Sequence, residues 1–526
     1  MMKKIIYFVF LSVSLLYFYG AVGRINLDNT HLYEYKPYPD ASEYLAMTKS
    51  ILNGDGLKFR IGNDWVPSRY PPGASLCYSI LGFVTHFKVE ELPFKTNYLI
   101  GNLILLTLSS YLYIRVGLVS ACTFPVLLVT FPGFVLYSRS PMSEMTSVFV
   151  ILIVLIMLTE YWVKDNLIYY ILACVFMGLS LLFRTQNLFF ALFLAIPLFK
   201  IDKCSWKKQI RVLCFGFVAF SFATIPLLYY NFHSYGSVAG TGYSYWLSKN
   251  LLTRMFSFDH IFSHLGMYYE QVLHPWKGVD SSPFYGSTTY FSAFFILLIP
   301  CSMIVLASHS KLARRFLVLG LLALVPILMY RFIRLRFHFT HMIFGILMIS
   351  VAYNYVCSKL LKRKSWKSIS VGCIFVVLMM GNLLGIVPTG NAGFQSLSAS
   401  FLKFDRLGRS SELYKVVEYL NANDRSVTNS VLVLTNYGIL TLYSMLDDAF
   451  LVIPASENHV YRHSERYRFE SVDIEAYLEN FKQNRMIVYL LDFQKRGNSL
   501  GLDDCLNKYI WRPVYSSDGV CVYIMR

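Results

Sequence analysis

Residues 142–162 read MSEMTSVFVILIVLIMLTEYW, an apolar run that carries charge only near its two ends. A helix of about 20 apolar residues is long enough to cross the ~30 Å hydrocarbon core of a bilayer. Similar runs recur along this 526-residue chain, of which 55% is hydrophobic and only 15% charged. The sequence therefore predicts a polytopic α-helical membrane protein.

The apolar runs predict about 11 transmembrane helices. One further run, residues 73–87, is short for a crossing, and we expect it to lie along the outer interface of the membrane. The first run follows Lys3 and Lys4, and we interpret it as an uncleaved helix rather than a cleaved signal. The expected spans lie near residues 4–22, 95–114, 116–137, 142–162, 167–183, 186–199, 208–230, 288–308, 312–331, 337–357 and 367–387.

Basic residues predict the orientation of these helices. The chain carries 48 Lys and Arg against 31 Asp and Glu, a net charge of +17. With a cytoplasmic N-terminus, every junction that returns to the cytoplasm is basic, for example residues 200–211 and 359–367, as the positive-inside rule requires. This placement accounts for the positive charge, so we expect no nucleic-acid partner. The larger outward features are then residues 23–94, 137–144, 231–287 and everything after 388.

The composition changes after the last expected span. Helix-like segments alternate there with strand-like runs, which is typical of a small α/β domain. We therefore divide the chain into a membrane domain, residues 1–390, and a soluble exoplasmic domain, residues 391–526. In the latter, Cys505 and Cys521 could pair if the domain faces an oxidising compartment. The helix-like segments are 410–423 and 472–484, and the strand-like runs are 430–435, 449–453, 486–491 and 520–524.

Two outward acids are candidates for catalysis. Asp40 opens an apparent helix over residues 41–52 and, with Glu43 three residues later, resembles a capping box, which is a structural role. The two roles are compatible, because backbone N–H groups at a helix start hold a carboxylate in place. Glu144 lies at the outer end of the fourth span, where the helix dipole also favours an acid. Ionisable groups at membrane depth are usually functional or paired.

Arginines on the outward side point to an anion. Arg331, Arg334 and Arg336 crowd the junction of the ninth and tenth spans, where the positive-inside rule disfavours them. Arg184 stands at a turn that we expect to be recessed in the membrane, and Arg69 precedes the interfacial run. Guanidinium groups bind phosphate in a bidentate manner. The structural alternative is that each one reaches toward lipid headgroups.

Nucleotide and metal motifs are missing from the sequence. There is no P-loop, no GxGxxG after a strand and no outward Asp-x-Asp pair. His459 and His463 lack the glutamate of a zinc-protease motif, and we interpret them as surface histidines. The activated donor of any transfer reaction is therefore expected not to be a nucleotide.

Several of these segments together resemble the GT-C superfamily, the polytopic glycosyltransferases that use polyprenyl-phosphate sugars. The likeness covers most of residues 1–345 and is greatest for the branch that holds protein O-mannosyltransferases, lipid A aminoarabinose transferases and the RgtA-like group. It rests on the order of these pieces: Asp40-x-x-x-Tyr44, Arg69-Tyr70-Pro71-Pro72-Gly73, Phe131-Pro132-Gly133 running into Ser143-Glu144, residues 178–184 (GLSLLFR), residues 226–236 (PLLYYNFHSYG), residues 278–283 (GVDSSP) and Arg336-Phe337-His338.

The resemblance implies a role for each matching residue. Asp40 would be the catalytic base and Glu144 the second acid, while Arg184 and Arg336 would bind the donor phosphate. The remaining residues expected to bind substrate are Tyr44, Arg69, Tyr70, Arg334 and His338. Many relatives carry two adjacent acids where this chain has Asp40-Ala41, and Phe339-Thr340 stands where relatives often show a proline. The first departure leaves the acceptor type and a divalent cation open; no cofactor is certain.

The function expected from the resemblance is inverting transfer of a hexosyl or pentosyl group from a polyprenyl-phosphate donor. The acceptor would be a glycan, lipid or protein at the exoplasmic face of the plasma (inner) membrane. All candidate groups would then share one exoplasmic cavity. The alternatives are a transporter or polymerase of lipid-linked oligosaccharide, or a non-catalytic lipid-binding protein. A transporter should place ionisable groups at the membrane midplane, whereas the spans here are nearly free of charge.

Overall fold

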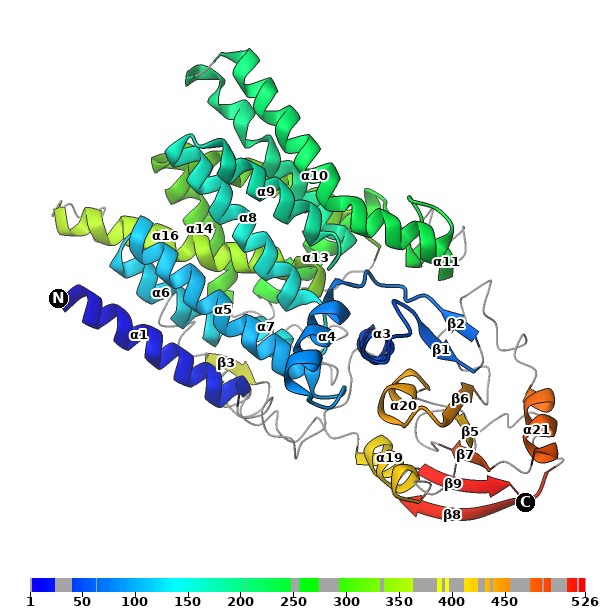
Figure 1. Cartoon of the computed structure of the whole chain (residues 1–526). Helices are drawn as coiled ribbons and strands as arrows, with labels where there is room; N and C mark the ends of the chain where they lie inside the picture. The colour runs from blue at the N-terminus through cyan, green and yellow to red at the C-terminus, as the bar shows by residue number, and fades with distance from the viewer. Residues whose placement is uncertain are drawn as a thin grey trace. The chain divides into compact units, whose positions relative to one another are not determined.

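Contacts divide the computed structural model into two compact units (Figure 1). We call the first the helical unit (Met1–Asp28, Phe94–Leu227 and Arg254–Leu407) and the second the mixed unit (Asn29–Pro93, Leu228–Thr253 and Gly408–Arg526). The structure describes residues 2–23, 40–62, 64–203, 205–246, 255–273, 293–331, 335–362, 386–389, 393–396, 411–423, 431–435, 439–454, 474–484, 487–492, 509–517 and 520–525.

The helical unit follows the predicted order of apolar segments. Its helices are α1 (Met2–Phe18, continued by the π-helical turn Tyr19–Gly23), α5 (Leu92–Arg115), α6 (Leu118–Thr130), α7 (Pro132–Ser138), α8 (Glu144–Lys164), α9 (Leu167–Ser180), the 3₁₀-helix η2 (Thr185–Lys203), α10 (Trp206–Tyr235), α13 (Asp259–Leu273), α14 (Ala293–His309), α15 (Lys311–Leu328), the 3₁₀-turn η4 (Leu335–His338) and α16 (Phe339–Lys362). A hairpin of β3 (Ile386–Thr389) and β4 (Gly393–Ser396) follows.

Helix length and composition bear out a polytopic membrane protein. Five helical segments among the described residues are long and apolar enough to cross a bilayer: Met2–Gly23, Leu92–Arg115, Glu144–Lys164, Trp206–Tyr235 and Arg336–Leu360. The total of about 11 spans stays a prediction, and most of the expected span 367–387 lies outside the described residues. The recessed position of the turn after α9 also stays a prediction.

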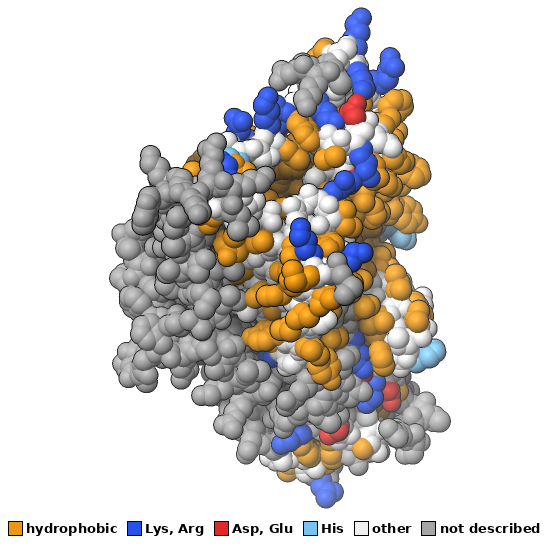
Figure 2. Space-filling view, turned by 90° about the vertical axis from the view of Figure 1, so that its left-hand side faces the viewer, with side chains coloured by type: hydrophobic (Ala, Val, Ile, Leu, Met, Phe, Trp, Pro, Cys, Tyr) orange, Lys and Arg blue, Asp and Glu red, His pale blue; other side chains and the backbone are white. Residues whose placement is uncertain are grey.

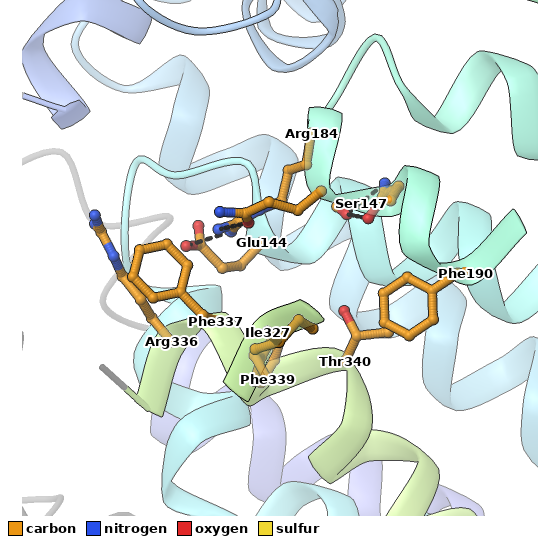
Figure 3. A pocket seen from close by; sticks show the side chains of 11 residues that line it. Glu144, Ser147, Arg184, Phe190, Ile327, Arg336, Phe337, Phe339 and Thr340 are labelled. Atoms are coloured by element: carbon orange, nitrogen blue, oxygen red, sulfur yellow. Dashed lines mark hydrogen bonds and ion pairs between the residues drawn. The ribbon is translucent and has the colours of Figure 1, made fainter. Parts of the chain in front are cut away.

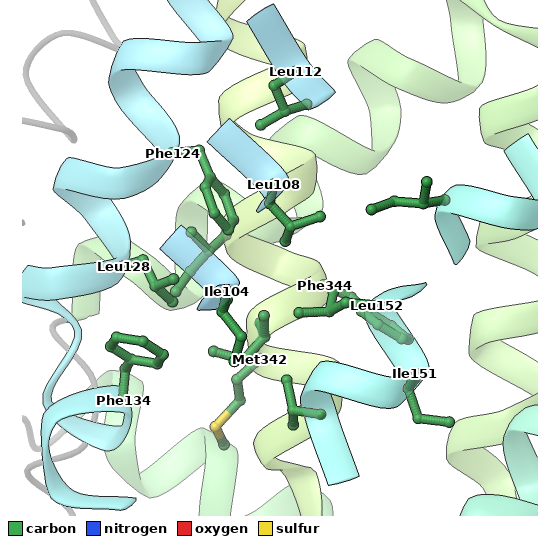
Figure 4. Close-up of a cluster of buried hydrophobic side chains, with 14 of the residues drawn as sticks. Ile104, Leu108, Leu112, Phe124, Leu128, Phe134, Ile151, Leu152, Met342 and Phe344 are labelled. Carbon is green, nitrogen blue, oxygen red and sulfur yellow. The ribbon is translucent and has the colours of Figure 1, made fainter. Parts of the chain in front are cut away.

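The core of the helical unit forms where the apolar faces of α1, α5, α6, α8 and α16 meet. On α8, Val148, Ile151 and Leu152 recur at helical spacing and are buried, and Leu108 of α5 and Phe124 of α6 lie in the same cluster (Figure 4). Outward faces are apolar as well, as the broad hydrophobic surface patches show (Figure 2). Apolar surface of this extent suits a lipid environment better than water.

The C-terminal part of the mixed unit is an α/β domain, as predicted. Its five strands lie in the order β6-β5-β7-β9-β8, with β5 parallel to β6 and β7, and β9 antiparallel to β7 and β8. Helices α19 and α20 cover one face of the sheet and α21 the other (Figure 1). The elements are α19 (Ser411–Asn423), β5 (Val431–Thr435), α20 (Ile439–Met445), β6 (Phe450–Pro454), α21 (Ile474–Gln483), β7 (Val488–Asp492), β8 (Trp511–Ser517) and β9 (Val520–Met525).

Residues 29–93, most of the first loop that is predicted to face outward, belong to this same unit. They contribute α3 (Asp40–Leu52), the β1–β2 hairpin (Phe59–Ile61 and Asp64–Val66) and α4 (Gly73–Thr85), and a later segment adds α11 (Gly242–Trp246). Residues 40–50 of α3 are all buried, because α3 packs against both α4 and α20. The predicted boundary near residue 390 stays a prediction. The C-terminal domain does not stand alone, however, since its contacts include α3 and β1.

Candidate active site

Two acids one helical turn apart open α3. Residues three apart on a helix lie on the same face, so Asp40 and Glu43 project in similar directions. The side chain of Asp40 is 11% exposed, whereas that of Glu43 is fully buried. Burying two carboxylates costs free energy unless cations or hydrogen-bond donors meet them.

Arg69 supplies that cation. Its Nε lies 2.5 Å from Glu43 Oε1, and its backbone N–H donates to Glu43 Oε2 over 2.8 Å. The Ser68 hydroxyl donates to the same Oε2 at 2.9 Å. A terminal nitrogen of Arg69 lies 4.0 Å from Asp40 Oδ1, so one guanidinium serves both acids. The capping-box interpretation of Glu43 is therefore replaced by an ion pair, since both of its oxygens are bound by Ser68 and Arg69.

The electrostatics of Glu43 reflect two opposing effects. Complete burial raises the pKa of the Glu43 carboxyl above its ordinary value. The charge of Arg69 and its hydrogen bonds to the carboxylate oppose that rise. The Asp40 carboxylate adds to it through like-charge repulsion.

Tyrosine rings lie beside these charges. The ring of Tyr70 stacks on that of Tyr44 with centroids 5.1 Å apart, and the ring of Tyr243 meets Tyr70 edge-on at 6.0 Å. The Arg69 guanidinium lies 5.6 Å from the centroid of the Tyr70 ring. Burial, and next the Asp40 charge, raises the pKa of the Tyr70 hydroxyl well above its ordinary value. Tyr70 is therefore a neutral phenol that can donate a hydrogen bond.

The backbone that carries Arg69 is fixed from the other side by residues of the 228–246 segment. The Tyr235 hydroxyl donates to the Ser68 carbonyl oxygen over 2.7 Å. A side chain at Gly242 would place its Cβ 2.3 Å from the Arg69 Cα, so only glycine fits there. These contacts hold Arg69 in the place where it meets the two acids.

The helical unit contains a second cluster of candidates, in a recess (Figure 3). Glu144 is the first residue of α8 and only 2% exposed, and its Oε1 lies 2.5 Å from Arg184 Nη1. Such a pair at a helix N-terminus is stabilised both by the cation and by the helix dipole. The recess is lined by Glu144, Ser147, Arg184, Gln186, Asn187, Phe190, Ile327, Arg336, Phe337, Phe339 and Thr340.

A buried amide fixes the turn that carries Arg184. Asn187 Nδ2 donates to Ser147 Oγ on α8 over 2.9 Å and to the Ser180 carbonyl over 2.9 Å. The same serine hydroxyl donates to Asn187 Oδ1 over 3.0 Å. The turn between α9 and η2 is thereby attached to α8, the helix that begins with Glu144.

Arg336 gives the recess an excess of positive charge. Its guanidinium lies 4.9 Å from the centroid of the Phe337 ring, and that of Arg184 lies 6.0 Å from the same ring. Two arginines and one glutamate leave one net positive charge among aromatic side chains. Such a site suits an amphiphilic anion.

His338 and Arg334 are also expected to bind substrate. His338 lies buried beside His264, with His338 Nε2 3.0 Å from His264 Nδ1, and it is not among the residues that line the recess. Its neighbour His264 contacts the Tyr330 carbonyl oxygen at 2.8 Å through Nε2. This contact joins η4 to α13, and substrate binding by His338 stays a prediction. Arg334 lies outside the described residues.

The structure thus gathers the candidates into two groups. Asp40, Tyr44, Arg69 and Tyr70 lie together in the mixed unit, and Glu144, Arg184 and Arg336 lie together in the helical unit. The shared exoplasmic cavity stays a prediction. Within the described ranges, no three His, Cys, Asp or Glu side chains gather in a way that could hold a metal ion.

Sequence reasoning missed the contact between Glu43 and Arg69. A signal for Glu43 itself was present, because a residue three positions after Asp40 shares its helix face. The roles of Asn187 and Gly242 could not be found in the same way, since their partners lie far away in the sequence.

These features define a polytopic membrane protein with a C-terminal α/β domain. Among solved structures, ArnT from Cupriavidus metallidurans bound to undecaprenyl phosphate is similar, with a TM-score of 0.65 and 12% identity over 98% of this chain and 97% of that one. The archaeal oligosaccharyltransferase AglB from Archaeoglobus fulgidus, in complex with an inhibitory peptide and a dolichol-phosphate, is similar with a TM-score of 0.52 and 13% identity over 99% of this chain and 74% of that one. No protein-family profile and no curated protein sequence matches the chain. The likeness to these structures confirms the predicted fold class.

Proposed function

We propose that this protein is a membrane glycosyltransferase that moves a sugar from a polyprenyl-phosphate donor to an acceptor. The observation that carries the proposal is the recess formed by Glu144, Arg184 and Arg336. Its net positive charge suits the donor phosphate, and its phenylalanine rings suit the first isoprene units of the donor lipid. Two solved structures of the same fold support this choice, since ArnT is bound to undecaprenyl phosphate and AglB to a dolichol-phosphate.

Asp40 is the general base of the proposed reaction. The acceptor hydroxyl or amine attacks the anomeric carbon, and Asp40 takes the proton that the acceptor loses. The bond from the anomeric carbon to the phosphate oxygen breaks with inversion, and its electrons leave with the polyprenyl phosphate. Base catalysis of this kind contributes ~10²–10⁴-fold.

Arginines from both groups of candidates supply positive charge to the proposed reaction. Arg69, held by Glu43, brings positive charge within 4.0 Å of Asp40 and limits the repulsion between the two acids. Arg184 and Arg336 neutralise charge on the departing phosphate, which stabilises the transition state. Glu144 orients Arg184, and Tyr44 and Tyr70 offer a ring surface and a hydroxyl for substrate. His338 and Arg334 remain candidate substrate ligands.

The proposed setting is the exoplasmic face of the plasma (inner) membrane. The α/β domain would then face outward together with α3. Hexosyl and pentosyl donors both fit the proposal, as do glycan, lipid and protein acceptors.

Mass spectrometry of cell-envelope glycans, with and without the protein, would identify the sugar and the acceptor. The purified protein in liposomes, supplied with that polyprenyl-phosphate sugar, should then transfer it. Asp40→Asn should insert and fold normally and lose transfer by ~10²–10⁴-fold, because the base is gone.

Asp64→Asn is the matched control, since Asp64 is exposed on β2 and its loss should leave transfer unchanged. If the Asp40→Asn protein transfers sugar at the wild-type rate, Asp40 is not the general base. An unchanged glycan profile together with altered export of lipid-linked oligosaccharide would favour a transporter instead.

A further inference from the structure

Lys49 joins α3 to the C-terminal domain inside the mixed unit. Its side chain is only 9% exposed, and its ammonium donates to the Tyr443 carbonyl over 3.0 Å and to the Leu446 carbonyl over 2.7 Å. The third contact of the ammonium is with Asp448 Oδ1 at 2.9 Å. All three N–H donors of this buried lysine are therefore used on one short stretch of the C-terminal domain.

The position of Lys49 has a clear electrostatic reason. α20 ends at Met445, and the last carbonyl groups of a helix lack partners within the helix and carry partial negative charge. A cation that reaches these carbonyls stabilises the helix end. Lys49 therefore acts as a C-terminal cap for α20 that is supplied by α3.

Further contacts follow the length of α3. Near Asp40, the Ser42 hydroxyl lies 2.7 Å from that of Thr441, and both side chains are buried. Near the other end, Ser50 Oγ lies 2.8 Å from the Tyr443 hydroxyl, and Asn53 donates to Asp448 at 3.0 Å.

Apolar packing fills the space between these polar contacts. A buried cluster joins Ala46 of α3, Phe59 and Ile61 of β1, and Leu440 and Tyr443 of α20. α3 is thus bonded to α20 at its start, its middle and its end, so the two helices are expected to move as one body.

We propose that the C-terminal α/β domain is the platform that positions the helix bearing Asp40, and that Lys49 is the principal positioning residue of this contact. The inference rests on the proposed function for the meaning of Asp40, but the contact itself can be tested without it. It gives the C-terminal domain a different task from a lid, because a lid must separate from the catalytic helix during turnover.

The first test compares Lys49→Met with Lys58→Met, a lysine exposed on the same unit. Hydrogen–deuterium exchange of residues 40–50 in the full-length protein in detergent should rise about tenfold or more in Lys49→Met, because the α20 cap and the ion pair are lost. Lys58→Met should exchange as the wild type does. In the transfer assay, Lys49→Met should lower kcat with little change in the KM for the donor, and Lys49→Arg should restore much of the loss.

A second variant keeps the proposal testable if Lys49→Met does not fold. The hydroxyls of Ser42 and Thr441 are in contact, so the double variant Ser42→Cys, Thr441→Cys is chosen to link α3 to α20 by a disulfide. The oxidised protein, verified by mass, should retain transfer, since α3 and the C-terminal domain need not separate. Loss of transfer on oxidation, with recovery on reduction, would overturn the platform and favour a lid.

The two proposals fail in distinguishable ways. Unchanged exchange of residues 40–50 in a folded Lys49→Met protein would overturn the platform, whatever the protein catalyses. Increased exchange in that variant would support the positioning role of the C-terminal domain. If the wild type then transfers sugar from no polyprenyl-phosphate donor, the glycosyltransferase function alone is ruled out.

Discussion

At the scale of single residues, charge pairing decides what each acid can do. Glu43 and Glu144 are both buried, and each lies within 2.5 Å of an arginine nitrogen. Asp40 lies 4.0 Å from Arg69 Nη2, and its side chain is 11% exposed, whereas those of Glu43 and Glu144 are almost fully buried. Of the three acids, Asp40 is the most exposed, which fits its proposed role as the base that meets the acceptor.

The Glu144–Arg184 pair allows structural and functional roles to be separated. Arg184→Gln should destabilise the protein by about 3–5 kcal/mol, because a buried carboxylate loses its partner. The double variant Glu144→Gln, Arg184→Gln should recover most of this stability, since no unpaired charge remains. If Arg184 also binds the donor phosphate, the KM for the donor should stay raised about tenfold or more in both variants.

Thermal unfolding and transfer kinetics on the same preparations would check this prediction. Recovery of donor affinity along with stability in the double variant would assign Arg184 a purely structural role.

At the scale of elements, residues of the 228–246 segment support the loop that carries Arg69. α11 lies against the backbone of Arg69 at Gly242, where no side chain fits. Gly242→Ala should displace Arg69, destabilise the protein by about 1–3 kcal/mol and lower transfer. Gly266→Ala on α13 is the matched control, because a Cβ there meets open space and alanine favours a helix.

Stability and transfer of the two glycine variants can be compared side by side. Normal kinetics of Gly242→Ala would mean that the placement of Arg69 is unimportant for the reaction.

Elements with a strong periodic signal could be predicted from the sequence. Both α8 and α3 are expected from the sequence, the first from an unbroken apolar run and the second from Asp40 and Glu43 at its start. α20 is only seven residues long and lies between two strands, so it has too few turns for a period to show. β8 contains Pro513 and few apolar residues, which is tolerated because β8 is an edge strand.

The site was less predictable than the elements. The candidate residues could be predicted because charged residues are rare in an apolar chain. Their partners could not, since pairs such as Glu43 with Arg69 are joined by chain reversal rather than by helical spacing.

At the scale of the whole molecule, the remaining question is which side of the membrane each part faces. The basic clusters predict a cytoplasmic start of α10, around Lys207, and an exoplasmic C-terminal domain. Two positions can report this, because Ile510 just before β8 is 72% exposed and Lys207 is exposed as well. Ile510→Cys and Lys207→Cys each place a reactive thiol on one of these surfaces.

An impermeant maleimide applied to intact spheroplasts should label the Ile510→Cys protein above the background of the native cysteines. The Lys207→Cys protein should gain label only after the membrane is permeabilised. The reverse pattern would place Asp40 and the α/β domain, which share the mixed unit, in the cytoplasm. An exoplasmic reaction would then be ruled out, because the proposed base would face the wrong compartment.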